Sequence, residues 1–306
     1  MVARYPKNQL EFERLFATEE SCEAFLWQIR FPEGYVCIAC AGTEYWTQTR
    51  SRRTCVSCHR ETSVLSGTSF HKSHLSLTVW FRCCWWFINQ KQGVSALGLQ
   101  RALGIGSYRS AWLALHKLRR AMITPGRNLL KGEVEADEIY IGGTESEGSK
   151  YRASKLLILI SVEKSGKGIG RIRMKLISDT SSETLLTGIR EMVEEGSAIE
   201  TDAWSGYMCL GANGYKHIRT QMAVTRKAKR EQDALPRVHR IASLFKRWML
   251  GTYQGRVDAK HLPRYLDEFV FRFNRRTSNS RGLLFLRLLE NCASTEATTY
   301  KEVTEE

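Results

Sequence analysis

Four cysteines near the start of this 306-residue chain have the spacing of zinc ligands. They form two Cys-x-x-Cys pairs with 14 residues between the pairs: Cys37, Cys40, Cys55 and Cys58. Four thiolates close a tetrahedron around Zn²⁺ and leave no coordination position open, so they predict a structural zinc ribbon over residues 31–72. The separation is slightly short for a ribbon, and the alternative is four unrelated buried thiols.

A second candidate site consists of carboxylates in the stretch GEVEADEIYIGG, residues 132–143. Side chains on a β-strand alternate with a period of two, so Glu133, Glu135 and Asp137 would share one face. Three carboxylates on one face repel one another unless a positive charge lies beside them. The stretch therefore predicts a cation site with Asp137 as its principal ligand, and with Glu135 and Glu138 as substitute or outer ligands.

The elements after residue 130 provide a partner for Asp137. Their apolar patterns predict three strands, a helix and a short fourth strand, at residues 133–143, 155–164, 170–179, 181–196 and 198–202. This order predicts a ribonuclease-H-like α/β domain over residues 130–282, in which the first and fourth strands are neighbours. Asp202, at the end of the fourth strand, would then face Asp137. Two close carboxylates either share a proton or bind a cation, and Mg²⁺ or Mn²⁺ is the cation that such ligands favour. The alternative is that the two aspartates are solvated edge residues.

A helical segment between the two sites has the features of a helix-turn-helix, at residues 73–126. Ser95 can cap a first helix, Gly104 can end it, and Ser107 can cap the next. The second helix is expected to expose Tyr108, Arg109, His116, Lys117, Arg119 and Arg120, of which Arg109 and Lys117 are predicted DNA contacts. An ordinary helical hairpin is the alternative.

The charge balance favours a polyanionic partner. Lys and Arg number 46 against 32 Asp and Glu, a formal net charge of +14, although a merely basic surface is the alternative. No apolar run reaches the roughly 18 residues of a membrane span, so a cytoplasmic, nucleoid-associated protein is expected. The other five cysteines lack ligand spacing and are predicted to be small core residues: Cys22, Cys83, Cys84, Cys209 and Cys292.

Basic residues are concentrated between residues 216 and 247, with ten Lys or Arg against two acids. The predicted DNA contacts there are Arg226, Lys227, Lys229, Arg230 and Arg247, and Arg272, Arg275 and Arg276 would extend this patch. The aromatic residues Trp204, Tyr207 and Tyr215 are either base-stacking or core residues. Residues 1–30 are predicted to be a helical segment and residues 283–306 a C-terminal tail, whose acidic end at residues 296–306 is expected to be poorly ordered.

A later helix, from about residue 238, carries two further polar candidates. His239 and Lys246 lie seven residues apart, about two turns, so they share a face with Ser243 between them. By itself this pattern favours an ordinary solvated basic helix.

Four stretches resemble bacterial insertion-sequence transposases of the DDE superfamily, in the group with an N-terminal zinc ribbon: VEADEIYIGG, TDAWSGY, HRIASLFKRW and YLDEFVFRFNRR. The resemblance implies cleavage of DNA at the ends of a mobile element and joining of those ends to a target. It places Asp137 and Asp202 at the first two catalytic acids. The third position, usually Glu, falls on His239, and Lys246 matches the basic residue that follows it.

Histidine departs from the acidic triad of that family, but it can ligate a divalent metal or accept a proton from the attacking water. Glu268 is the other candidate for the third acid. The resulting hypothesis is a transposase that binds double-stranded DNA, as a homo-oligomer when bound, with structural Zn²⁺ and catalytic Mg²⁺ or Mn²⁺. The alternatives are a structure-specific nuclease of the same fold and a non-catalytic, zinc-dependent DNA-binding regulator.

Overall fold

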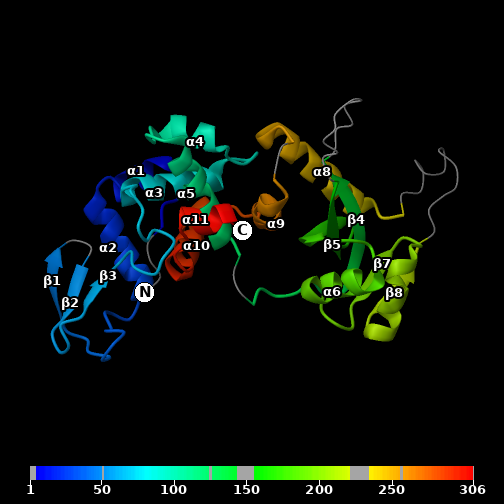
Figure 1. Cartoon of the computed structure of the whole chain (residues 1–306), viewed down its shortest axis with the longest axis horizontal. Helices are drawn as coiled ribbons and strands as arrows, with labels where there is room; N and C mark the ends of the chain where they lie inside the picture. Colours follow the sequence, from blue (N-terminus) through cyan, green and yellow to red (C-terminus); the bar gives the residue numbers. More distant parts are fainter. Residues whose placement is uncertain are drawn as a thin grey trace. The chain divides into compact units, whose positions relative to one another are not determined.

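The computed structural model describes residues 5–49, 52–123, 126–142, 155–220, 234–255 and 258–305. The chain forms two compact units, the first from residues 1–124 and 278–306 and the second from residues 125–277 (Figure 1). Within the described ranges, no helix has the length and apolar character needed to cross a membrane.

The first unit begins with helices α1 (Gln9–Leu15) and α2 (Glu19–Arg30), followed by a small three-stranded sheet. Its strands β1 (Tyr45–Thr49), β2 (Arg52–Cys55) and β3 (Glu61–Ser63) are antiparallel in that order. The guanidinium of Arg53 lies 3.9 Å from the Trp27 ring of α2 and 4.2 Å from the Tyr45 ring. This cation–π sandwich joins the short sheet to a helix, which a sheet of this size needs for stability.

Helices α3 (Leu77–Asn89), α4 (Ala96–Leu103) and α5 (Tyr108–Ala121) follow the sheet. The predicted caps are confirmed, because the Ser95 and Ser107 hydroxyls accept backbone N–H groups at the starts of α4 and α5. Gly104 ends α4 in the left-handed conformation, at φ 62°, which a residue without a Cβ adopts at little cost. Local sequence therefore determines this helical pair.

The exposed face predicted for α5 is partly wrong, because His116, Lys117 and Arg119 are buried. Lys117 is 4% exposed and donates to the His71 carbonyl at 3.3 Å. Burial lowers the pKa of Lys117. Since this ammonium is inside the first unit, it is not available to a DNA phosphate. Arg109 is exposed, with its guanidinium 3.5 Å from the Tyr300 ring.

The prediction of a poorly ordered acidic end is wrong, since Tyr300–Glu305 form helix α11, which belongs to the first unit together with α10 (Arg281–Ser294). Phe285 of α10 is fully buried among aromatic rings of other helices: Phe12, Phe16, Phe81 and Trp85. Burial of an aromatic side chain contributes about 2–3 kcal/mol. The sequence alone did not reveal that α10 is buried, because the aromatic residues that it contacts lie near the other end of the chain.

The second unit is a mixed α/β domain. Its sheet contains β4 (Glu133–Ile141), β5 (Leu156–Ser165), β6 (Gly168–Ile177), β7 (Ala198–Thr201) and β8 (Lys216–Arg219). The spatial order is β6-β5-β4-β7-β8, with β4, β5 and β6 antiparallel, and with β7 parallel to both β4 and β8. The predicted strand–strand–strand–helix–strand order is confirmed, whereas β8 was not predicted.

Helices cover both faces of this sheet. One apolar cluster joins β4 and β7 to helix α6 (Ser182–Met192) and the 3₁₀ segment η1 (Ser205–Asn213). The other joins β4, β5 and β6 to α8 (Pro236–Tyr253) and to α9 (Leu262–Asn274), which follows the short η2 (Ala259–His261). Because β4 faces both clusters, its alternate side chains meet α8 on one side and η1 on the other.

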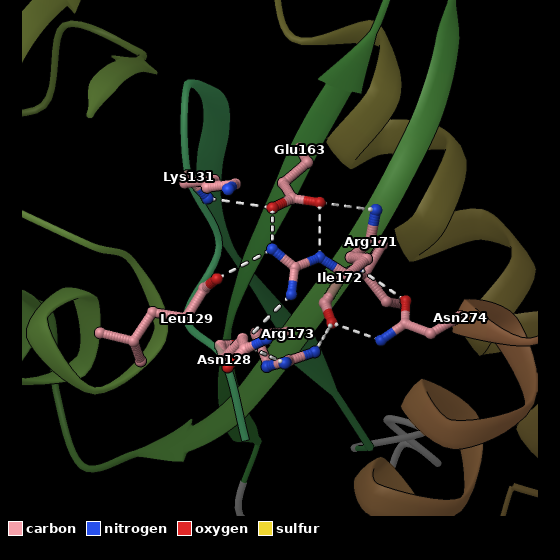
Figure 2. A network of polar contacts seen from close by, with 8 residues as sticks. All are labelled: Asn128, Leu129, Lys131, Glu163, Arg171, Ile172, Arg173 and Asn274. Atoms are coloured by element: carbon pink, nitrogen blue, oxygen red, sulfur yellow. Dashed lines mark hydrogen bonds and ion pairs between the residues drawn. The ribbon is translucent and has the colours of Figure 1, made fainter. Parts of the chain in front are cut away.

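The end of α9 is tied to the edge strand β6 (Figure 2). The Asn274 amide accepts from Ile172 N at 2.8 Å and donates to Ile172 O at 3.1 Å, so it occupies positions that a further strand would use. Arg276 lies over the Phe273 ring and donates to the carbonyls of Gly170 and Ile169. The FRFNRR motif therefore closes a sheet edge, and Arg276, which was predicted to extend the DNA patch, has carbonyl partners on β6.

Arginines of β6 extend the same network toward the residues that precede β4 (Figure 2). Arg171 forms an ion pair with Glu163 of β5 and donates to Leu129 O at 2.9 Å. Arg173 donates to Asn128 O at 2.8 Å, and burial lowers the pKa of Arg173 to about 10. These hydrogen bonds hold the residues that precede β4 against the edge of the sheet.

Candidate functional site

The four ribbon cysteines converge. Their sulfur atoms all lie within 4.8 Å of one another. The two Cys-x-x-Cys loops have the same backbone pattern, since Cys37 N donates to Gly42 O at 2.9 Å and Cys55 N to Arg60 O at 3.0 Å. The residue after each second cysteine has positive φ, 59° at Ala41 and 57° at His59. Two equivalent loops thus point four sulfur atoms at one centre.

The surroundings of the sulfur atoms fit a bound Zn²⁺. Backbone N–H groups of Ala39 and Cys40 donate to the Cys37 sulfur and lower the pKa of Cys37 to about 6. The pKa of Cys40 is raised to about 12, because contacts with Cys58 and Cys55 outweigh the N–H bond from Gly42. A Cβ on Gly42 would lie 3.2 Å from the Cys55 sulfur and 3.4 Å from that of Cys40. The absence of a side chain there leaves the cluster room. The structure therefore supports a structural zinc site at the predicted cysteines.

The acidic site is built on the pairing of β4 with β7. In this parallel pair Glu135 lies opposite Glu200. Two residues further along each strand direction come Asp137 and Asp202, so the register carries the two aspartates toward the same end of the sheet. Burial raises the pKa of Glu138, and the negative charges of Asp137 and Asp202 raise it further. The carboxylates of Asp137 and Asp202 are thus close enough to Glu138 for their charges to affect its ionisation.

His239 lies against this acidic end. Its Nε2 is 3.4 Å from Asp137 Oδ2, while the Asp137 side chain is 16% exposed and that of His239 38%. Ser243 and Lys246, which share a face of α8 with His239, are exposed. One stripe of α8 lines a hollow of about 330 Å³ with Pro236, His239, Arg240, Ser243, Leu244 and Arg247. The predicted DNA contact Arg247 therefore lines the same hollow as the predicted catalytic histidine.

Convergence is less complete at the acids than at the cysteines. Within the described parts of the chain, the four cysteines are the one group of three or more His, Cys, Asp or Glu side chains whose donor atoms gather closely enough to hold a metal ion. Asp137 contacts His239, and strand register relates it to Asp202. Four predicted DNA contacts, Arg226, Lys227, Lys229 and Arg230, lie outside the described residues.

Glu135 has a role that differs from the predicted one. Its carboxylate is 1% exposed and accepts the backbone N–H groups of Arg237 at 2.8 Å and Val238 at 3.1 Å. It also forms an ion pair with the Arg237 guanidinium at 2.8 Å. The N-cap residue of α8, Leu235, provides no side-chain cap. Glu135 therefore caps α8 from a neighbouring strand, where the helix dipole favours a negative charge, and it is not a substitute metal ligand.

Replacing Glu135 by Gln is expected to lower the free energy of unfolding of the second unit by about 3 kcal/mol. Breaking one side of a buried ion pair costs roughly that amount, at the low end because Arg237 is partly exposed. Urea unfolding followed by circular dichroism measures the change. The control is Glu133→Gln on the same strand, where the side chain is 71% exposed, with an expected loss below about 0.5 kcal/mol. Equal losses in the two variants would contradict the capping role.

Two other candidates have structural partners. Glu268, the alternative third acid, is fully buried and accepts from Arg272 Nε at 2.8 Å and from the Tyr253 hydroxyl at 3.2 Å. Tyr207 and Tyr215 are core residues, whereas Trp204 is 47% exposed. Glu268 therefore has hydrogen-bond partners on α8 and α9 and is not open to a metal site. Of the three aromatic residues, Trp204 alone exposes a ring surface on which a base could stack.

The chain thus combines a four-cysteine ribbon with a mixed α/β unit that carries carboxylates at the ends of its strands. These two features define its class as a zinc-ribbon protein with an acidic site. Residues 17–61 match the transposase zinc-ribbon domain, and residues 129–274 match the ISXO2-like transposase domain. The chain belongs to the insertion-sequence transposases that carry an N-terminal zinc ribbon.

One curated protein and one solved structure are similar to parts of this chain. An uncharacterized protein in transposable element ISH50 of Halobacterium salinarum is 27% identical over 132 residues, which are 42% of this chain and 44% of that protein. The chain thus spans less than half the length of this relative. Among solved structures, a chain of the simian T-cell lymphotropic virus intasome in complex with PP2A regulatory subunit B56 gamma aligns at 15% identity. Its TM-score is 0.30, over 61% of this chain and 70% of its own.

Proposed function

We propose that the chain is a DNA transposase that cleaves the ends of its element and joins their 3′ ends to target DNA by metal-dependent phosphoryl transfer. The observation that carries this proposal is the register of β4 and β7, which runs toward Asp137 and Asp202 at one end of the sheet, where His239 lies against Asp137. The order β6-β5-β4-β7-β8, with three antiparallel strands and then two parallel ones, supports a ribonuclease-H-like fold for the second unit.

The donor set suits a hard divalent cation. Carboxylate oxygens and an imidazole nitrogen are ligands for Mg²⁺ or Mn²⁺. Burial raises the pKa of the adjacent Glu138, and the negative charges of Asp137 and Asp202 raise it further. Asp137, Asp202 and His239 would hold the metal. When bound, such ions lower the pKa of an attacking water and stabilise the leaving oxygen of a phosphodiester.

The residues of the chain would then orient DNA and move protons in two steps. First, water attacks a phosphodiester at the element end, so that a new P–O bond forms and the bond to the 3′ oxygen breaks. Second, the freed 3′-hydroxyl attacks a phosphodiester of the target and displaces its 3′ oxygen. His239 acts as a metal ligand or accepts the proton of the attacking group, and Lys246 holds a phosphate from the same helix face.

DNA would follow the basic stripe of α8. Arg240 and Arg247 line the hollow next to His239 and present guanidinium groups that match phosphate oxygens. In the first unit, the exposed Arg109 at the start of α5 and the zinc ribbon would recognise the element ends. Phosphate contacts set the position of the duplex, and contacts with base edges would provide specificity.

Replacing His239 by Ala is expected to slow Mg²⁺- and Mn²⁺-dependent cleavage of an element-end duplex by about 10²- to 10⁴-fold, the contribution typical of a positioned acid–base group. Single-turnover cleavage measures the rate, with the DNA taken from the sequence flanking the gene for this chain. Binding of the duplex should change little. The control is His74→Ala, at an exposed histidine of the first unit. Unchanged cleavage by the His239→Ala protein would remove this residue from the site.

A plasmid assay for strand-transfer products tests the reaction class. Joined products support a transposase, whereas cleavage without joining would identify a structure-specific nuclease. Duplex binding with no metal-dependent cleavage would identify a DNA-binding regulator.

A further inference from the structure

The turn that carries Asp202 lies beyond the end of the strand pairing. The β4–β7 register extends to Glu135 and Glu200, and β7 ends at Thr201. Asp202 follows this strand and precedes η1, so the backbone ladder does not hold it against β4. Any precise placement of its carboxylate relative to Asp137 needs other contacts.

Contacts with η1 and Thr180 provide part of this placement. The Asp202 carboxylate accepts from Trp204 N at 3.0 Å, and the Trp204 indole donates to Thr180 O at 3.2 Å. Gly206 allows close approach, because a Cβ there would lie 2.6 Å from Thr180 O and 2.7 Å from a methyl group of Leu185. The residues of the TDAWSGY motif thus shape the turn around Asp202.

The last residue of that motif reaches the strand that carries Asp137. The Tyr207 hydroxyl donates to Glu138 Oε2 at 2.6 Å, and its side chain is fully buried. Glu138 directly follows Asp137 on β4 and points to the opposite face of the sheet. The short, charge-assisted hydrogen bond therefore connects the Asp202 turn to β4 next to Asp137.

We propose that Tyr207 and Glu138 form a positioning pair that fixes Asp202 relative to Asp137 and so sets the affinity of the site for a divalent cation. This inference rests on the proposed function. It gives Glu135 and Glu138 of β4 parallel roles on opposite faces of the sheet. Glu135 holds α8, which carries His239, and Glu138 holds η1, which follows Asp202. Groups that orient metal ligands commonly change metal affinity by about 10- to 100-fold.

The chain offers a matched control for the Tyr207 hydroxyl. Tyr215 is buried in the same apolar cluster, and its hydroxyl donates to Val193 O at 3.2 Å. Neither Asp137 nor Asp202 is its partner in this bond. Tyr207→Phe and Tyr215→Phe therefore each remove one hydrogen-bonded hydroxyl from one core, and comparable thermal destabilisation is expected. A difference in metal affinity between them would report the link to the acids.

The experiment is a Mn²⁺ titration of the full-length, zinc-loaded protein followed by electron paramagnetic resonance, without DNA. We expect Tyr207→Phe to raise the Kd for Mn²⁺ by about 10- to 100-fold and Tyr215→Phe to leave it unchanged. Asp202→Asn identifies the relevant site in the wild-type protein. If the wild-type protein has no Mn²⁺ site that depends on Asp202, the proposed function fails. If that site is present and Tyr207→Phe binds Mn²⁺ normally, only the positioning pair is wrong.

Glu138→Gln tests the other member of the pair and can be measured even if the Tyr207→Phe protein does not fold. Glu138→Gln retains an oxygen that accepts from the Tyr207 hydroxyl, so its Kd should rise by about fivefold or less, through loss of a nearby charge. A loss of Mn²⁺ affinity as large as that of the Asp202→Asn protein would identify Glu138 as a direct metal ligand and would overturn the positioning role.

Discussion

Replacing either Asp137 or Asp202 by Asn is expected to reduce Mg²⁺-dependent cleavage of an element-end duplex by at least about 10³-fold. Metal ions stabilise the transition state of phosphoryl transfer by several kcal/mol, and each 1.36 kcal/mol is tenfold in rate. Asparagine keeps the shape of aspartate but removes the charge that holds the cation. Single-turnover cleavage over a range of Mg²⁺ concentrations measures the loss and shows whether excess metal restores activity.

Two comparisons make this result specific. Asp179→Asn changes an aspartate of the same unit that accepts from Ser181 N at the start of α6, and asparagine can accept the same bond, so cleavage should be unaffected. Metal-free binding of the duplex by the Asp137 and Asp202 variants should be equal or tighter, because a negative charge near the phosphates is removed. If both variants cleaved the duplex at the wild-type rate, the mechanism would be excluded.

Replacing Cys40 by Ser is expected to remove most of the zinc and to unfold the ribbon. A structural zinc ion contributes about 10–16 kcal/mol of binding free energy in small zinc domains, and that free energy is also folding free energy. The ribbon strands have five, four and three residues, which is too little sheet to be stable in isolation. Metal analysis gives the zinc content, and amide hydrogen exchange reports the loss of protection in β1, β2 and β3.

The control for this variant is Cys209→Ser, at a partly exposed cysteine of the second unit, where the zinc content should stay at its wild-type level. Because the ribbon and the acidic site belong to different compact units, the second unit should keep its own thermal transition when zinc is lost. A Cys40→Ser protein with full zinc content and a protected ribbon would contradict the four-cysteine site.

Much of the local structure could be predicted from sequence because its determinants are close together in the chain. Ser95, Gly104 and Ser107 act within their own helix turns, and they delimit α4 and α5 as expected. Each Cys-x-x-Cys loop is closed by backbone bonds over four or five residues. The alternation of acidic and apolar residues in β4 and the short apolar run of β5 also predicted two strands, because a strand that is covered on both faces is apolar along most of its length.

The acids of β4 show where such reasoning stops. Sequence reasoning assigned Glu135, Asp137 and Glu138 to one cation site. The contacts give them three roles, because Glu135 meets α8, Glu138 meets η1, and Asp137 lies beside His239. Residue type and spacing do not distinguish a buried capping carboxylate from a metal ligand. The distinction depends on which N–H groups and hydroxyls the fold brings within reach.

The sequence by itself determined the zinc-ligand spacing, the helix caps, the strand order and the two aspartates, because each follows from local periodicity or from residue chemistry. The tertiary structure decided the partners. Glu135 and Arg237 are 102 residues apart, Glu138 and Tyr207 are 69, and Arg120 meets Thr298 across 178. Burial of Lys117 and packing of α10 likewise depend on distant segments. Such contacts form only when the whole chain has buried its apolar surface, and no short stretch of sequence encodes them.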